Sequence, residues 1–173
     1  MTSVDAILGA SGSSGDADRR RAMLADVRDG LSRHSRELSP KYFYDERGSR
    51  LFEEITRLPE YYLTRAEREI LIARAPQIIE VTRARTLVEL GAGSAAKTRI
   101  LLAAMRRCTE FVTYVPIDVS EEFLEQTRDA LEEELPWLRV EPVVADMGVE
   151  IELPSVVDCP VLFAFLGSTI GNF

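Results

Sequence analysis

The chain has 173 residues, of which 46% are hydrophobic and 29% charged, and its formal net charge is −8. That length and apolar content suit a single globular domain with a real core. The acidic balance disfavours a nucleic-acid partner, because phosphate binding needs clustered Lys and Arg. No apolar run approaches the roughly 20 residues that span a bilayer, and no basic segment followed by an apolar one opens the sequence. We therefore expect a cytoplasmic protein without a membrane partner.

Few side chains are available for metal or triad chemistry. The single histidine, His34, leaves little material for a catalytic triad or a histidine metal site. Cys108 and Cys159 lack metal-ligand spacing, and we predict reduced, structural thiols.

The first half of the chain predicts helices around an aromatic segment. Residues 1–18 are small and polar, which predicts a disordered lead-in. Residues 18–37 have apolar side chains at helical spacing, and residues 67–83 predict a second helix that Pro76 would divide. The segment between them includes five of the chain's twelve Tyr and Phe residues in two short runs, Tyr42, Phe43 and Tyr44, then Tyr61 and Tyr62. They could cover a ligand or simply pack a cap. We interpret residues 19–83 as a helical N-terminal cap that contributes to a substrate and cofactor pocket.

Residues 86–98 predict a strand, a tight turn and a helix that opens at Ala95 and Ala96. Gly91 and Gly93 allow a sharp turn and a close approach of a ligand to the backbone. Gly91-x-Gly93-x-x-Ala96 fits a relaxed dinucleotide pattern, so the turn alone leaves nicotinamide cofactors, S-adenosylmethionine and a plain connecting turn all open.

The rest of the chain alternates helices with strands. A helix is predicted over residues 97–107, a strand over 111–117, a helix from Ser120 as N-cap to about residue 134, and strands over 137–145 and 159–166. This alternation predicts a parallel, doubly wound, Rossmann-like α/β sheet, whose ligands lie at the carboxyl ends of the strands. The residues expected at those ends are Glu89, Gly91, Asp118, Asp146 and Asn172.

Two acids at strand ends distinguish the candidate cofactors. Asp118 lies 118 − 91 = 27 positions after Gly91, longer than the roughly 20 typical of a dinucleotide ribose acid. Asp146 follows the next strand. A cationic sulfonium without phosphates tolerates an acidic pocket better than a pyrophosphate does, which favours S-adenosylmethionine.

Several motifs together resemble the class I methyltransferases, and more closely the L-histidine Nα-methyltransferases of ergothioneine biosynthesis. They are Tyr44-Asp-Glu-Arg-Gly-Ser-x-Leu-Phe-Glu, Leu58-Pro-Glu-Tyr-Tyr-Leu-Thr-Arg, Glu89-Leu-Gly-Ala-Gly-Ser-Ala-Ala-Lys-Thr, Tyr114-Val-Pro-Ile-Asp-Val-Ser and Phe165-Leu-Gly-Ser-Thr-Ile-Gly-Asn-Phe. The resemblance implies an enzyme that transfers three methyl groups from S-adenosylmethionine to the α-amino group of histidine, giving hercynine. The cofactor contacts that it implies are Tyr61, Gly91, Lys97, Asp118 and Asp146. It also implies that Tyr44 and Asn172 form part of the amino-acid pocket.

The sequence departs from this family in length. Chains of the family continue well beyond this point, so we expect an N-terminal portion in which residues 84–173 form the first half of the cofactor domain, with a sheet incomplete after its fourth strand. We expect such a chain to self-associate through the open sheet edge and to bind the cofactor while methylating histidine slowly. A silent cofactor-binding fragment and an NAD-dependent oxidoreductase are the alternative functions.

Overall fold

The computed structural model describes residues 14–147 and 150–172, and most of the predicted lead-in lies outside these ranges. The chain forms two compact units, Met1–Tyr42 and Phe43–Phe173, each described here by itself. In the first unit, helix α1 spans Ser14–Ser32 and is followed by the short 3-10 helix η2, Pro40–Phe43. Tyr42 donates a hydrogen bond to Asp26 over 2.5 Å, and Lys41 forms an ion pair with the same carboxylate at 3.2 Å.

Helix α1 ends five residues before the predicted end at residue 37. Beyond Ser32 the chain turns back, because the Glu37 amide donates to the Gly30 carbonyl. The Arg33 guanidinium binds both Asp29 and Glu37, which holds the turn. Side-chain pairing therefore replaces the last predicted turn of the helix.

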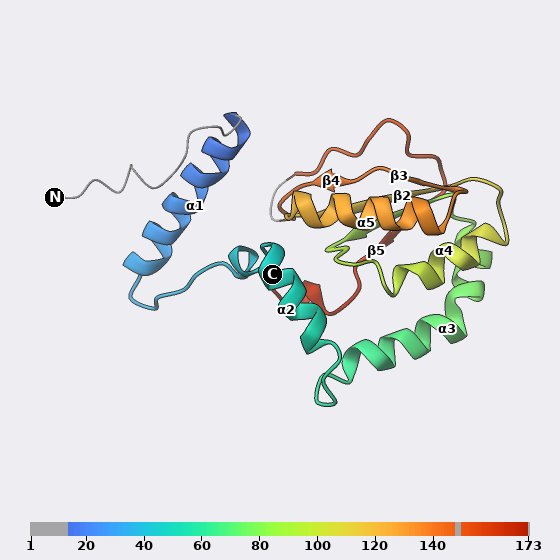
Figure 1. Ribbon diagram of the computed structural model, residues 1–173, viewed down its shortest axis with the longest axis horizontal. Helices are drawn as coiled ribbons and strands as arrows, with labels where there is room; N and C mark the ends of the chain where they lie inside the picture. The colour runs from blue at the N-terminus through green and yellow to red at the C-terminus, as the bar shows by residue number, and fades with distance from the viewer. Residues whose placement is uncertain (1–13, 148–149, 173) are drawn as a thin grey trace. The chain divides into compact units, whose positions relative to one another are not determined.

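The second unit is a parallel sheet with helices (Figure 1). Its helices are α2 Glu46–Ile55, α3 Leu63–Thr82, α4 Thr98–Arg106, α5 Glu121–Glu134 and the 3-10 helix η3 Thr169–Asn172. Its strands are β1 Thr86–Leu90, β2 Val112–Asp118, β3 Leu138–Val140, β4 Val143–Val144 and β5 Val161–Ala164.

The strand order confirms the predicted parallel α/β fold. The sheet runs β3-β2-β1-β5, with β4 also paired to β2, and every pairing is parallel. The chain moves outward from β1 through β2 to β3, then crosses back so that β5 pairs with the other side of β1. This reversal is the topological switch point, where open α/β sheets bind ligands beyond the carboxyl ends of the strands.

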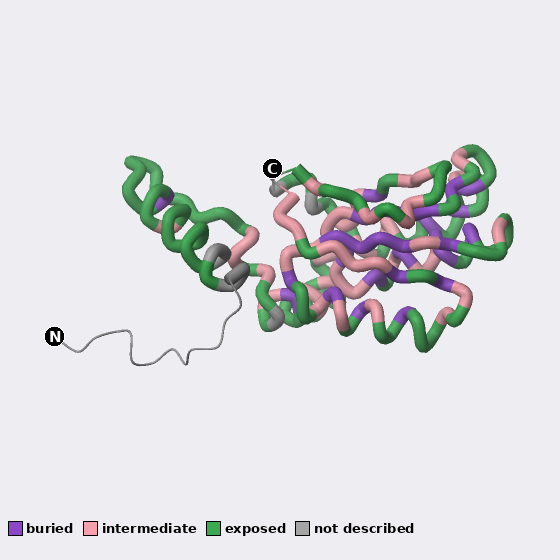
Figure 2. Tube along the Cα trace, turned by 90° about the horizontal axis from the view of Figure 1, so that it is seen from above, coloured by how far each residue is buried: buried purple, intermediate pink, exposed green. Residues whose placement is uncertain are grey.

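The two faces of the sheet are covered differently. On one face, Leu87, Val112 and Tyr114 pack with buried residues of α3, α4 and α5. On the other, Val88, Val115 and Ile117 pack against the segment that joins β4 to β5, including Ile151 and Val157. Figure 2 shows the resulting burial, with the central strands continuously buried and the helices buried only along one stripe. Of the described helices, α3, α4 and α5 thus pack on the same face of the sheet.

The start of α2 explains the spacing of the first motif. The Asp45 carboxylate accepts a 2.7 Å hydrogen bond from the Gly48 amide and so caps the helix. A Cβ on Gly48 would lie only 1.6 Å from the Phe43 carbonyl oxygen. Both residue types are thus required for the turn that leads into α2.

Two prolines act differently from each other. Pro76 was expected to divide a helix, but α3 is continuous, because Leu71, Ala75 and Ile79 bury one stripe on both sides of it. Pro142 interrupts the strand predicted over residues 137–145, which the structure divides into β3 and β4. Proline lacks the amide donor that the ladder needs at that point.

The helix starts after β1 and β2 also differ from the predictions. Ala95 has φ 51°, incompatible with a helix, so α4 begins at Thr98 rather than at Ala95. The Ser120 side chain makes no capping hydrogen bond. Instead, the Asp118 carboxylate accepts hydrogen bonds from the amides of Val119 and Ser120.

Two general features concern the surface. No helix within the described ranges is long and apolar enough to cross a membrane.

Cys108 lies just after α4, and both it and Cys159 are free and exposed, so neither packs in the core as a structural thiol would.

Candidate functional site

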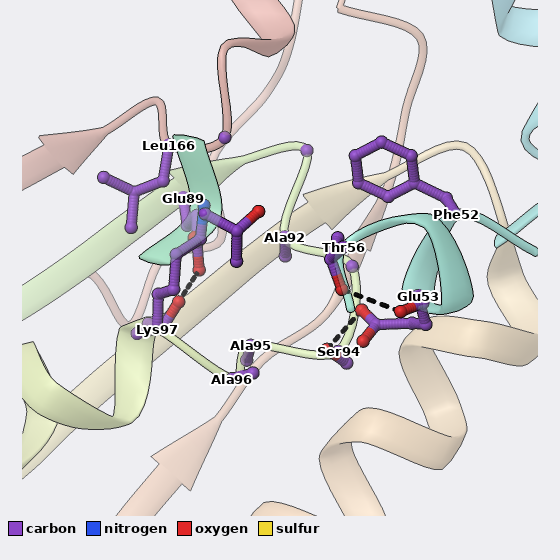
Figure 3. A pocket seen from close by; sticks show the side chains of 15 residues that line it. Phe52, Glu53, Thr56, Glu89, Ala92, Ser94, Ala95, Ala96, Lys97 and Leu166 are labelled. Carbon is purple, nitrogen blue, oxygen red and sulfur yellow. Dashed lines mark hydrogen bonds between the residues drawn. The ribbon is translucent and has the colours of Figure 1, made fainter. Parts of the chain in front are cut away.

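A pocket opens at the carboxyl ends of β1 and β5, at the switch point (Figure 3). It encloses about 590 Å³ of empty space, part of it open to solvent. The lining residues come from α2, the start of α3, the end of β1, the glycine turn and the segment after β5; they are Phe52, Glu53, Thr56, Thr64, Glu89, Gly91–Thr98, Leu166 and Gly167. The glycine turn therefore borders the pocket, as predicted.

The glycine turn is built from residues with left-handed backbone. Gly91 and Gly93 have φ values of 68° and 51°, a region that glycine enters without steric cost. A Cβ on Gly93 would contact nothing within 4 Å, so the backbone angle rather than space requires glycine there. Ala95 adopts φ 51° despite its Cβ, a strained conformation of the kind that collects at functional sites.

Glu89 lies at the base of the pocket in an apolar setting. It is 2% exposed, and its Oε2 accepts hydrogen bonds of 2.5 Å from both the Thr98 and Tyr114 hydroxyls. Burial raises the pKa of Glu89 to about 7, although the two hydrogen bonds oppose the rise. Burial also raises the pKa of Tyr114. The carboxyl group thus joins β1, β2 and the start of α4 at one point.

Asp118 ends β2 and contacts the glycine turn. Its Oδ2 accepts a 3.3 Å hydrogen bond from the Gly93 amide, while Oδ1 accepts from the start of α5. Asp146 lies two residues after β4, whose Val144 is paired with Asp118 in the sheet. The structure therefore brings both predicted acids to the same end of the sheet.

Lys97 is already paired in this structure. Its ammonium forms an ion pair with Glu67 of α3. The Glu67 carboxylate also accepts from the Gly167 amide, at 3.0 and 3.1 Å to its two oxygens. Lys97 and Gly167 both line the pocket, on the loops after β1 and β5 respectively.

The predicted aromatic residues form a small cluster around Phe52. Tyr44 and Tyr61 each lie edge-on to its ring, with centroids 6.0 and 5.9 Å away. Phe52 lines the pocket, whereas neither tyrosine is among the lining residues. Asn172 falls in η3, and its side chain lies outside the described part of the structure.

Sequence reasoning passed over several pocket residues. Glu53 accepts a 2.6 Å hydrogen bond from the Ser94 hydroxyl, which ties α2 to the glycine turn (Figure 3). Phe52 and Glu53 end the first motif quoted above, and Ser94 lies inside the glycine motif, so the signal was their place within those motifs. Nothing in the sequence pattern marks Glu67, whose partners are 30 and 100 positions away.

In residues 14–147 and 150–172, no group of three or more His, Cys, Asp or Glu is placed to hold a metal ion.

Comparison with known families decides the classification. The family model described as "Histidine-specific methyltransferase, SAM-dependent" matches residues 23–173. The chain belongs to this family.

Relatives of the histidine-specific methyltransferase family are similar over most of the chain. A histidine N-alpha-methyltransferase from Mycobacterium tuberculosis is 46% identical over 152 residues, which cover 87% of this chain and 47% of that protein. A histidine N-alpha-methyltransferase from Mycolicibacterium smegmatis is 45% identical over 152 residues, which again cover 87% of this chain and 47% of that protein. The chain thus spans about half the length of the curated relatives it matches.

Among solved structures, a methyltransferase from Podospora anserina with bound SAH is similar at a TM-score of 0.37 and 15% identity. The match covers 79% of this chain and 53% of that one.

Proposed function

We propose that this chain supplies the cofactor-binding part of an S-adenosylmethionine-dependent N-methyltransferase that acts on the α-amino group of histidine, forming hercynine for ergothioneine biosynthesis. The observation that carries the proposal is the family match over residues 23–173, together with relatives named histidine N-alpha-methyltransferase. Tyr61, Gly91, Lys97, Asp118 and Asp146 are the proposed cofactor contacts. The proposed amino-acid contacts are Tyr44 and Asn172.

The donor groups around the pocket support this cofactor. Lys97 is the only Lys or Arg among the lining residues, so one carboxylate, rather than a pyrophosphate, matches the positive charge available. Asp118, which is hydrogen-bonded to the Gly93 amide, suits a ribose diol. These features disfavour the nicotinamide alternative, which would bring two phosphates to a single, already paired lysine.

S-adenosylmethionine would supply a methyl group activated by a positive sulfur. The substrate ammonium would first lose a proton to solvent; the freed lone pair would then take the methyl group as the carbon–sulfur bond breaks, and S-adenosylhomocysteine would leave. The protein needs only to align the nitrogen, methyl carbon and sulfur, and no covalent nucleophile is required. Aromatic faces such as the Tyr44–Phe52–Tyr61 cluster also suit a nitrogen that keeps its positive charge as it gains methyl groups.

Isothermal titration of the chain with S-adenosylhomocysteine and, separately, with NADH tests the proposal. We expect S-adenosylhomocysteine to bind saturably and NADH not to bind. Binding of NADH alone would replace the proposal with an oxidoreductase. A coupled S-adenosylhomocysteine release assay, run with histidine and several other amino acids, then tests the substrate. Equal turnover of all amino acids would remove histidine from the proposal while leaving the methyltransferase.

A further inference from the structure

One carboxylate bridges the two sides of the pocket. Glu67, on α3, binds the Lys97 ammonium on the loop after β1 and the Gly167 amide on the loop after β5. These two loops lie on opposite sides of the switch point, because β5 pairs with β1 on the side away from β2. Glu67 thus anchors both loops through one carboxylate.

Glu67 itself does not line the pocket, whereas both of its partners do. A lysine ammonium on a flexible four-carbon stem is poorly ordered unless something holds it. Gly167 has φ 79° and the next residue, Ser168, has φ 63°, so this loop is held in an uncommon backbone conformation. The Glu67 carboxylate fixes the charge on one side and the backbone on the other.

The chemistry of the partners indicates which part of a ligand they meet. Lys97 is the only cation among the lining residues, so the carboxylate of a bound ligand is drawn to it. Asp118 lies instead at the end of β2, beside Gly93. The ligand's amino-acid end and its ribose would therefore lie at different ends of the glycine turn.

We propose that Glu67 is a positioning residue for the amino-carboxylate end of the methyl donor, acting through Lys97 and Gly167. The inference rests on the proposed function, since it assumes a ligand that carries such an end. It adds a residue that neither the motifs nor the pocket lining identify.

Two ligands that differ only at this end provide the test. S-adenosylhomocysteine carries the amino-carboxylate, whereas 5′-methylthioadenosine keeps the nucleoside and sulfur and lacks it. For Glu67→Ala we expect the affinity for S-adenosylhomocysteine to fall about tenfold, as for the loss of a charged hydrogen-bond partner, and that for 5′-methylthioadenosine to stay within about twofold. Glu67→Gln keeps an oxygen for the Gly167 amide and should give a smaller loss, again only for S-adenosylhomocysteine. Glu69→Ala, an exposed change on the same helix, should change neither affinity.

Equal weakening of both ligands in a folded Glu67→Gln variant would mean a merely structural role and would overturn the inference, as would unchanged or tighter binding of S-adenosylhomocysteine in Glu67→Ala. In the double variant Glu67→Ala/Lys97→Ala, the affinity for S-adenosylhomocysteine should fall by less than the two single-variant losses combined, because part of the Glu67 effect acts through Lys97. If the two single-variant losses of affinity added in full in the double variant, that result would also contradict the inference. If the unaltered chain bound neither ligand, the proposed function would fail first, and this inference with it.

Discussion

At the residue scale, the site depends on two carboxyl groups with opposite surroundings. Glu89 is enclosed by apolar strands and helices and receives two hydroxyl donors on one oxygen. Asp118 is half-buried and accepts backbone amides on both oxygens. Burial penalises the charged form of the first, whereas the second binds backbone amides of the glycine turn and of the segment that leads into α5. The two acids of the site are therefore suited to different tasks.

The buried Glu89 predicts a pH dependence of stability. Its pKa is about 7 in the folded chain against 4.5 for an unburied glutamate, so between these pH values the folded state holds more protons than the unfolded state. The free energy of unfolding should therefore fall as pH rises from about 4.5 to 7, by up to about 3 kcal/mol, and level off above that. Urea unfolding at pH 5, 6, 7 and 8 measures it. Glu89→Gln should flatten the slope, and the exposed change Glu80→Gln should not; equal slopes in all three proteins would contradict the prediction.

Asp118 predicts a loss of cofactor binding. Asp118→Ala removes the proposed ribose acceptor and the acceptor of the Gly93 amide, so we expect affinity for S-adenosylhomocysteine to fall at least about tenfold by isothermal titration. Asp129→Ala removes an exposed carboxylate on α5 and serves as the control. Tight binding by Asp118→Ala would assign the ribose to another residue.

At the element scale, α2 contributes one wall of the pocket, and its position depends on how it starts. Phe52, Glu53 and Thr56 line the pocket from its last turn and its end. The helix is directed by the Asp45 cap and by the close approach of Gly48 to the Phe43 carbonyl. A local change at the first turn should therefore alter the pocket wall more than two turns of helix away.

Gly48→Ala is expected to destabilise the second unit. The added Cβ would lie 1.6 Å from a backbone oxygen that cannot rotate away, so the turn must shift. Overpacking of this kind costs about 1–3 kcal/mol, measurable as a lower urea midpoint, and S-adenosylhomocysteine binding should weaken with it. Gly171→Ala is the matched control, since a Cβ there contacts nothing within 4 Å. Similar midpoints for both variants would show that the turn adapts.

These elements show which features of the fold a sequence pattern can predict and which it misses. The parallel α/β class, the central strands and the glycine turn were predictable, because apolar runs that end in Gly or Asp carry a strong local signal. Burial across the whole stripe of α3 overrode the local effect of Pro76, and the left-handed Ala95 delayed α4, neither of which a periodicity detects. Glu67 was missed because its partners come from distant segments, and only the folded chain brings them together.

At the scale of the whole second unit, the sheet has an open side. Within the described residues β5 pairs only with β1, and its Phe163 is 60% exposed. An apolar edge strand offers unpaired backbone groups and side chains to a second copy. The expected self-association of this chain therefore has a definite location.

Phe163→Lys should reduce that self-association, since a charged residue on an edge strand opposes pairing. We expect light scattering after size-exclusion chromatography to show a larger monomer fraction at the same concentration. Phe111→Lys changes a phenylalanine that is even more exposed, just before β2 and away from β5, and should have little effect. An equal response to both changes would indicate general surface hydrophobicity, and a fully monomeric unaltered chain would remove the association itself.

The bridge from Glu67 to Gly167 spans 100 positions of the chain, which has a consequence for biosynthesis. A ribosome adds about 5–20 residues per second, so Glu67 emerges about 5–20 seconds before Gly167, and β1 and the glycine turn also emerge before that residue. During that interval β1 can pair with β2, but its other side waits for β5. A small molecule that contacts both sides of the pocket can therefore stabilise the sheet only after β5 has emerged, and it cannot act as a template for the earlier pairing of β1 with β2.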